Sequence, residues 1–393
     1  MIYQNVDLRD LFLLNNDITF LNHGSFGSCP TPIFEEFQRY QKLLEFQPIA
    51  FLDEHIEQNI LKSQQALSDF INCDADDIVF ITNPTTAINE IMRSITLNNG
   101  DEILSSNHEY GALDKAWDFI CKKRGANHVK ADIPNPIPSK EKFIHAFTSS
   151  ITSRTKVIFI SHITSSTGLI FPIREIIKIA QQKNIITIID GAHVPGHIPL
   201  DLTDLGADIY TGTCHKWLLC PKGTSFLYVE KKLQNQIEPL IVSWGYESSE
   251  FTRTPFQNNH LWQGTRDISP FLTLSKAIEF REKYKWNNVS KICKKMILNF
   301  RKELLSRFET EPLFEHNAYE WLGQMYSFSI PNHINECEQI KSKLIHKYNI
   351  EVPVFIWNDK LYIRISLNGY NSEDDLHRLL TVLPKIISGY NSP

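Results

Sequence analysis

Paired cysteines are missing from this sequence, although cysteine itself is present. The chain has 393 residues and seven cysteines, and no two of them form a Cys-x-x-Cys pair. Disulfide frameworks and small zinc modules depend on cysteines that come in pairs. We therefore expect a reduced, cytoplasmic protein with no structural metal site, in which Cys214 and Cys220 are small buried residues.

Long apolar runs and blocks of like charge are lacking as well. No segment approaches the ~20 apolar residues that a membrane-spanning helix needs, and residues 1–7 do not resemble a signal peptide. The formal net charge is −5, without a basic block, so we expect neither nucleic acid nor membrane as a partner. A hydrophobic content of 42% is ordinary for a globular protein, and this length can bury a large core.

Short apolar runs alternate with amphipathic helical segments over the first two thirds of the chain. Near-continuous apolar runs are typical of strands in a largely parallel sheet that helices cover on both faces. The predicted strands are residues 77–82, 101–106, 127–131, 156–161, 185–189 and 223–229.

The pattern changes after residue 268, where one long helix is predicted from Ser269 to about Phe308. Strands at 325–330, 351–355 and 360–366 and two further helices follow it, which indicates a compact α+β unit. We predict three parts: an N-terminal segment (1–19) near the small domain, a large domain (20–268), and a region (269–393) with the connecting helix and the small C-terminal domain.

One lysine, Lys216, stands between His215 and Trp217 in a polar stretch that follows Thr213. Burial disfavours an ammonium ion, so a buried lysine can offer a neutral amine that forms a Schiff base with an aldehyde cofactor and later acts as a base. A purely structural lysine is the alternative, and this context favours the functional one.

A carboxylate, Asp190, ends the apolar run 185–189 and is followed by Gly191 and Ala192. In that position it would keep the ring nitrogen of such a cofactor protonated, although a helix N-cap is the ordinary alternative. His193 could then hydrogen-bond near the phenolic oxygen of the cofactor. His193 and His197 do not form a metal pair, because Pro195 and Gly196 break the helix that would bring them together.

Polar residues recur where other predicted strands end, the edge at which open α/β sheets bind ligands. Thr85 and Thr86 open a helix, which makes either an anion site or an ordinary N-cap. His108 and Tyr110 follow another strand, and they would either stack on a flat ligand or serve only in packing. The loop 20–30, rich in small residues, is equally compatible with an active-site loop and with a plain surface loop.

In this order the motifs resemble the class V branch of the fold-type I pyridoxal-phosphate enzymes. Within that branch, the stretches 21–27, 107–110 and 263–267 resemble the isopenicillin N epimerase-like group, which also includes sulfoxide lyases of thiol-histidine biosynthesis. The likeness spans nearly the whole chain; each motif alone is unspecific, and five in order are specific. It implies a seven-stranded, mostly parallel sheet between helices, and a homodimer whose active sites are shared across the interface.

The resemblance also implies roles for residues around bound pyridoxal 5'-phosphate. Phosphate would lie at Thr85, Thr86, Thr213 and His215, with Thr265 reaching in from a second subunit. His108 or Tyr110 would stack on the cofactor, and Ser165 would face its oxygen. An amino-acid substrate would be bound through Arg364, whose fork matches a carboxylate, and through Asn22 and His23.

The implied reaction begins with removal of the Cα proton of an L-amino acid by Lys216, and Tyr110 could serve as the acid on the other side. The cysteine desulfurases of class V carry a mobile-loop cysteine before the substrate-binding arginine, and residues 349–362 contain none. Persulfide chemistry on a cysteine nucleophile is therefore not expected. Because lyases are the more widespread enzymes among the relatives that the resemblance implies, we expect β-elimination by a C–S lyase that acts on a cysteine-derived substrate. The alternatives are an epimerase, an aminotransferase and a non-catalytic binding module.

Overall fold

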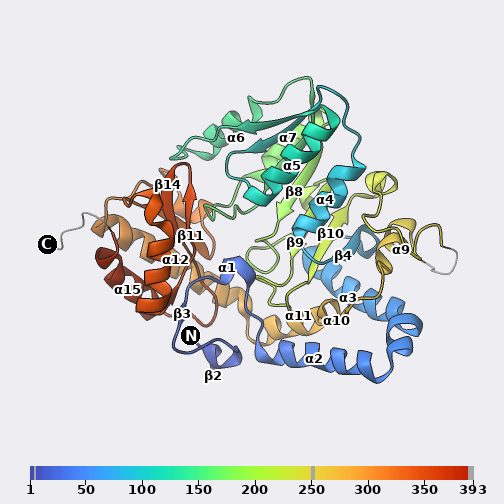
Figure 1. Ribbon diagram of the computed structural model, residues 1–393, viewed down its shortest axis with the longest axis horizontal. Coiled ribbons are helices and arrows are strands. Elements are labelled where there is room, and N and C mark those ends of the chain that lie inside the picture. The colour runs from blue at the N-terminus through green and yellow to red at the C-terminus, as the bar shows by residue number, and fades with distance from the viewer. Residues whose placement is uncertain (4–5, 249–252, 388–393) are drawn as a thin grey trace.

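The computed structural model describes residues 1–3, 6–248 and 253–387. It has an α/β body built on one large sheet, and the C-terminal residues form a smaller unit beside that body (Figure 1). No helix in the described residues is long and apolar enough to cross a membrane.

The large sheet has seven strands in the order β4-β10-β9-β8-β7-β5-β6, and β10 is the one strand that runs antiparallel to its neighbours. The predicted mostly parallel, seven-stranded sheet is therefore confirmed. The strands are β4 (Ile78–Ile81), β5 (Glu102–Ser106), β6 (Asn127–Ala131), β7 (Thr155–Ser161), β8 (Ile186–Gly191), β9 (Ile209–Thr213) and β10 (Ser225–Val229).

Both faces of most of this sheet are buried, which is why β4, β7 and β8 are largely apolar, whereas the edge strand β6 is partly exposed and more polar. In β4, Ile78 and Phe80 join one hydrophobic core, whereas Val79 and Ile81 join the other. This alternation follows from the two-residue period of a strand. Helices α4 (Pro84–Ser94) and α5 (Gly111–Arg124) cover one face; the other is covered by α3 (Ile56–Ile71), α6 (Lys140–Thr148), α7 (Ile173–Gln182), α10 (Ser269–Leu272) and α11 (Leu274–Lys283).

The smaller unit is built on a three-stranded antiparallel sheet in the order β11-β14-β13. Its elements are α12 (Trp286–Arg307), β11 (Met325–Ile330), α14 (Cys337–Ser342), β13 (Val354–Trp357), β14 (Lys360–Ser366) and α15 (Glu373–Val382). Near the N-terminus, β3 (Thr19–Phe20) pairs with β12 (Ile350–Glu351), and the ring of Phe12 lies 4.9 Å from that of Tyr370. The N-terminal residues thus pack on this unit, while the domain boundaries remain predictions.

The prediction of one continuous helix from Ser269 to Phe308 is wrong. The segment divides into α10, α11 and α12, and Lys285, with φ of +46°, separates the last two in the left-handed region. Neither glycine nor proline marks this break, so the local sequence carries no ordinary signal for it. The remaining helices include α1 (His23–Phe26), α2 (Thr31–Phe46), α8 (Leu202–Leu205), α9 (Pro255–Leu261) and α13 (Ala318–Trp321).

Candidate active site

Lys216 lies in the loop that follows β9, at the carboxyl edge of the large sheet. Its Nζ is 3.4 Å from Nε2 of His193. Burial, followed by the charge of Arg364, lowers the pKa of Lys216 to about 7, even though the charge of Asp190 acts to raise it. A large fraction of the lysine is therefore a neutral amine near pH 7, as an amine nucleophile requires.

Asp190 lies near the end of β8, between Ser161 of β7 and Thr211 of β9 in the strand register. The residue is 5% exposed, and Oδ1 accepts a hydrogen bond from the backbone N–H of Ala192 at 2.9 Å. Burial raises the pKa of the carboxyl group, although this hydrogen bond and Lys216 act to lower it. A buried carboxylate with one oxygen held this way can pair its charge with a cationic ring nitrogen.

The N-terminal loop packs directly beneath the lysine loop. Gly27 has φ of +69°, and a Cβ on it would come within 2.1 Å of the His215 carbonyl oxygen, so only glycine fits this approach. His23 is fully buried, with Nδ1 2.8 Å from the hydroxyl of Tyr370 and Nε2 3.0 Å from the Lys216 carbonyl oxygen.

The structure places His23 against the lysine loop. Both of its ring nitrogens contact protein groups, and burial lowers its pKa to about 3. These contacts support the lysine loop, while the role of His23 in substrate binding remains a prediction.

Arg364 of β14 is 5% exposed and has no carboxylate partner among the described residues. Its Nη1 donates to the carbonyl oxygen of Ser165 at 2.6 Å and lies 3.3 Å from Oγ of the same residue, while Nη2 donates to Ser25 Oγ at 2.9 Å. Ser25 Oγ in turn donates to Asn22 Oδ1, so Asn22 acts on the arginine through Ser25. The Nε–H is buried without a partner in this structure, so the guanidinium can still donate a hydrogen bond to a bound anion.

Several donors gather where the phosphate is predicted. Thr85 and Thr86 lie in the first turn of α4, and the side chain of Asn83 caps this helix by accepting the Thr86 N–H at 2.8 Å. The Thr213 hydroxyl is buried without a partner, and His215 is placed by a 3.2 Å contact between Nδ1 and the Thr224 carbonyl oxygen. A helix start beside an unpaired buried hydroxyl fits a phosphate group.

The two aromatic candidates after β5 differ in exposure. His108 is fully buried, with Nδ1 3.1 Å from Thr167 Oγ1 and its ring 4.7 Å from that of Trp357, and its Nε2 is without a partner. Tyr110 is the N-cap residue of α5 and is 44% exposed. Which ring stacks on the cofactor remains a prediction, as does the contact of Ser165 with the cofactor oxygen.

Three positioning groups were missed by the sequence analysis: Glu109, Trp217 and Arg281. Glu109 accepts the backbone N–H of Ser161 at 2.9 Å, and burial raises its pKa to about 8. Arg281 of α11 donates to the carbonyl oxygens of Trp217 at 2.8 Å and Gly196 at 2.9 Å. Glu109 stands between His108 and Tyr110, two predicted site residues, so its place at the site could have been predicted from the sequence. No feature of the sequence near Arg281 indicates its role.

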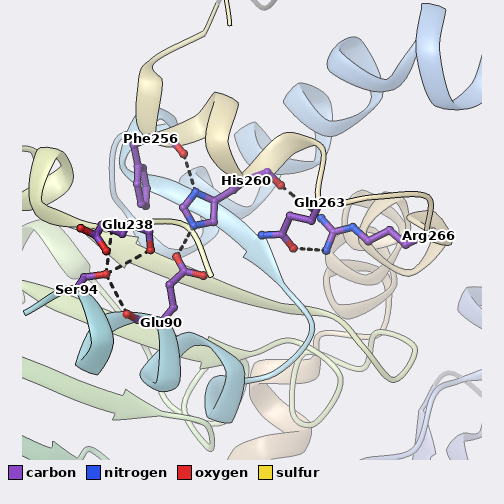
Figure 2. A network of polar contacts seen from close by, with 7 residues as sticks. All are labelled: Glu90, Ser94, Glu238, Phe256, His260, Gln263 and Arg266. Carbon is purple, nitrogen blue, oxygen red and sulfur yellow. Dashed lines mark hydrogen bonds and ion pairs between the residues drawn. The ribbon is translucent and has the colours of Figure 1, made fainter. Parts of the chain in front are cut away.

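The segment 263–266 is held by the network in Figure 2. His260 of α9 pairs with Glu90 of α4 through Nε2 and with the Phe256 carbonyl oxygen through Nδ1 at 2.7 Å. Arg266 donates to Oε1 of Gln263 at 2.8 Å and to the His260 carbonyl oxygen at 3.4 Å. Thr265, on the same segment, is exposed.

The fold of this chain is shared by pyridoxal-phosphate enzymes. A cysteine desulfurase from Thermococcus onnurineus NA1, solved in its apo form, superimposes with a TM-score of 0.81 at 20% identity, covering 99% of both chains. The buried lysine with its lowered pKa, the buried carboxylate and the unpaired hydroxyl of this site form a set that fits pyridoxal phosphate.

The sequence comparisons define the family. The model of the class-V aminotransferases matches residues 35–379, so the chain belongs to this family of pyridoxal-phosphate-dependent enzymes. It is 29% identical to the isopenicillin N epimerase of Amycolatopsis lactamdurans over 391 residues, covering 96% of this chain and 97% of the relative. It is 25% identical to an L-cysteine desulfhydrase of Arabidopsis thaliana over 403 residues, covering 93% and 87%. The resemblance stated from the motifs is confirmed.

Proposed function

We propose that this protein is a pyridoxal-phosphate-dependent C–S lyase that removes the sulfur group of a cysteine-derived L-amino acid by β-elimination. The observation that carries the proposal is a buried lysine, its pKa lowered to about 7, at the same site as a buried arginine whose Nε–H has no partner in this structure. The first group can remove a Cα proton, and the second can hold the α-carboxylate of the same substrate.

Different residues of this chain bind the cofactor, orient the substrate and remove the proton. Pyridoxal phosphate, when bound, supplies an aldehyde for the substrate amine and a ring that accepts the electrons left at Cα. Thr85, Thr86, Thr213 and His215, with Thr265 of a second copy, hold the phosphate, and Asp190 balances the charge of the ring nitrogen. Arg364 orients the substrate, and Lys216 removes the Cα proton.

Loss of the sulfur group needs a second proton, which goes to the departing sulfur atom. We assign this proton to the Tyr110 hydroxyl, because the side chain is accessible and lies at the end of β5 in the motif that contains His108. For L-cysteine the overall reaction consumes one water and yields pyruvate, ammonia and hydrogen sulfide.

Two observations favour β-elimination with free release of the sulfur. A similar protein is named an L-cysteine desulfhydrase. In this chain residues 349–362 hold no cysteine, and the Sγ of Cys337, on α14, lies 3.5 Å from the Val354 carbonyl oxygen, so no thiol of this stretch can accept the sulfur. Epimerisation is the second candidate, favoured by the 29% identity to isopenicillin N epimerase.

Product analysis tests the proposal. The protein is incubated with pyridoxal phosphate and L-cysteine or an S-substituted cysteine, and pyruvate, ammonia and thiol are measured with the configuration of the remaining amino acid. We expect pyruvate and ammonia in equal amounts, with none from the Lys216→Ala variant. An amino acid of inverted configuration, formed without pyruvate, would show that the enzyme is an epimerase rather than a lyase. A requirement for an oxo-acid acceptor would indicate a transaminase.

We also propose that the enzyme is a homodimer. A groove of about 600 Å³ is lined largely by apolar side chains, among them Ile49, Trp244 and Trp262, and the first two are 70% and 76% exposed. Trp262 lies next to the segment that carries the exposed Thr265. A second copy of the chain that covers this groove would therefore contact this segment, and Thr265 could reach the active site of that copy.

The dimer is tested by charge insertion into the groove. Trp244→Glu should shift the protein towards monomer in analytical ultracentrifugation and weaken pyridoxal-phosphate binding. Tyr319→Glu, at a residue that is 70% exposed on the smaller unit, is the matched control and should change neither property. A dimer that persists in Trp244→Glu would refute this placement.

A further inference from the structure

Trp217 follows the lysine directly and is 1% exposed. Its indole Nε1–H donates a hydrogen bond to Nδ1 of His193 at 3.3 Å. An indole nitrogen can only donate. Nδ1 of His193 must therefore be the acceptor and carry no proton.

The remaining nitrogen of His193 is then determined. Burial lowers the pKa of His193 well below its ordinary value, and the positive charges of Lys216 and Arg364 lower it further, so the ring is neutral. A neutral imidazole carries one N–H, and with Nδ1 accepting, that hydrogen is on Nε2. This same Nε2 lies 3.4 Å from Nζ of Lys216.

We propose that Trp217 is a positioning residue: by fixing the Nε2–H tautomer of His193, it favours the unprotonated amine of Lys216. An ammonium group has only donors, so it would face the Nε2–H donor to donor, whereas a neutral amine accepts this hydrogen through its lone pair. The inference rests on the proposed function only in that it concerns the amine on which that function depends.

The indole is held rigidly enough to do this. The backbone carbonyl of Trp217 accepts a hydrogen bond from Arg281. The indole ring lies 4.0 Å from the His197 ring and 4.8 Å from the His23 ring. Arg281 thus fixes the backbone of Trp217, and rotation of the indole away from His193 would disturb its ring contacts with His197 and His23, which come from two other segments of the chain.

Other charged groups around Lys216 set the background on which Trp217 acts. The charge of Arg364 disfavours the ammonium, and that of Asp190 favours it. His23 contacts the carbonyl oxygen of Lys216, and His215 precedes it; burial lowers the pKa of both imidazoles. Trp217→Phe removes none of these groups and keeps an aromatic ring beside His23, so the effect of the lost N–H can be measured separately.

The test uses the apoprotein, so that it does not depend on turnover. In ¹⁵N-histidine NMR spectra of the unaltered protein, we expect His193, assigned by its loss in His193→Gln, to show the Nε2–H tautomer. The pKa of Lys216 is obtained from competitive acetylation across pH, with the peptide that contains Lys216 quantified by mass spectrometry. Trp217→Phe removes the donor and keeps most of the ring, and it should raise that pKa by about one unit, an approximately tenfold smaller ratio of amine to ammonium.

Trp117→Phe is the matched control. Trp117 is a fully buried indole of α5 whose Nε1 has no partner in this structure, so its substitution tests lost packing without a lost hydrogen bond. It should leave the acetylation curve of Lys216 unchanged.

Two results would overturn the inference: an Nδ1–H tautomer in the unaltered protein, or identical Lys216 curves for the unaltered protein and Trp217→Phe. The first measurement needs no variant at Trp217, so the inference stays refutable even if that variant fails to fold. If the tautomer differs but lyase activity is present, only this inference fails. If the tautomer is as stated but no pyruvate forms, only the proposed reaction fails.

Discussion

Substitution of Arg364 should separate recognition of the substrate carboxylate from all other binding. In the structure this guanidinium uses Nη1 on Ser165 and Nη2 on Ser25, and its Nε–H has no partner. Of its five N–H groups, two or three are used in these contacts, so at least two and at most three remain for a substrate carboxylate. A hydrogen bond to a charged group contributes ~1.5–3 kcal/mol, so a bidentate contact contributes ~3–6 kcal/mol.

Arg364→Gln should therefore lower kcat/KM for L-cysteine by a factor of about 10² to 10⁴. The assay that isolates the carboxylate compares two inhibitors. 3-Mercaptopropionate keeps the carboxylate and should bind at least ~30-fold more weakly to the variant, which corresponds to ~2 kcal/mol. Cysteamine lacks the carboxylate, and its inhibition constant should stay within about threefold.

Arg174→Gln is the control for loss of an arginine, because Arg174 pairs with Asp204 on the exposed side of α7. It should leave both inhibition constants unchanged. Equal weakening of 3-mercaptopropionate and cysteamine by Arg364→Gln would mean that the site has collapsed or that Arg364 does not hold the carboxylate, and the reasoning would be refuted.

Three further substitutions test individual parts of the site. Gly27→Ala should destabilise the apoprotein by ~2 kcal/mol or more in chemical denaturation, because φ is +69° and the new Cβ would meet the carbonyl oxygen of His215. Glu109, whose folded-state pKa is raised to about 8, contributes stability that is lost as pH rises from 4.5 to 8; Glu109→Gln should flatten that decline in thermal melts of the apoprotein. Glu90→Ala should cost ~3 kcal/mol or more in the same denaturation assay, because it leaves His260 buried without its partner, whereas Glu90→Gln should cost less.

Each of these substitutions has its own contrary outcome. Gly100 also has a positive φ, of +85°, but an added Cβ would meet nothing within 4 Å, so Gly100→Ala is the control for strain without collision. Equal losses at Gly27 and Gly100 would contradict the proposed contact with the lysine loop. An unchanged pH slope in Glu109→Gln would show that another group titrates, and equal losses for the two Glu90 variants would show that the pair adds nothing beyond packing.

The sheet could be predicted from sequence because burial on both faces makes most of its strands, such as β4, β7 and β8, short apolar runs. The strand ends could be predicted for the same reason: the first polar residues after the runs, such as Asp190 and Thr85, lie at the ligand edge of any open α/β sheet. The break at Lys285 could not, because a left-handed lysine depends on the packing of α11 and α12 rather than on local propensity.

Contacts between distant residues account for the other differences. From the sequence, the loop that contains His23 is equally compatible with a surface loop and with an active-site loop. Only its contacts with Tyr370 and Asn368, about 345 residues away, show that His23 is buried against the lysine loop. The hydrogen bond from Trp217 to His193 likewise joins two loops after different strands. Patterns of burial along the chain reveal strands and their ends, but they do not reveal which side chains from separate loops meet.

The central claim, that Lys216 holds the cofactor, is tested most directly by chemical trapping. The holoenzyme is reduced with borohydride, digested, and mapped by mass spectrometry for the lysine that carries the reduced pyridoxyl group. The account predicts a single modified peptide that contains Lys216, and no modified peptide from Lys216→Ala. A pyridoxyl group on a different lysine, or a protein that takes up pyridoxal phosphate without forming any reducible bond, would contradict it.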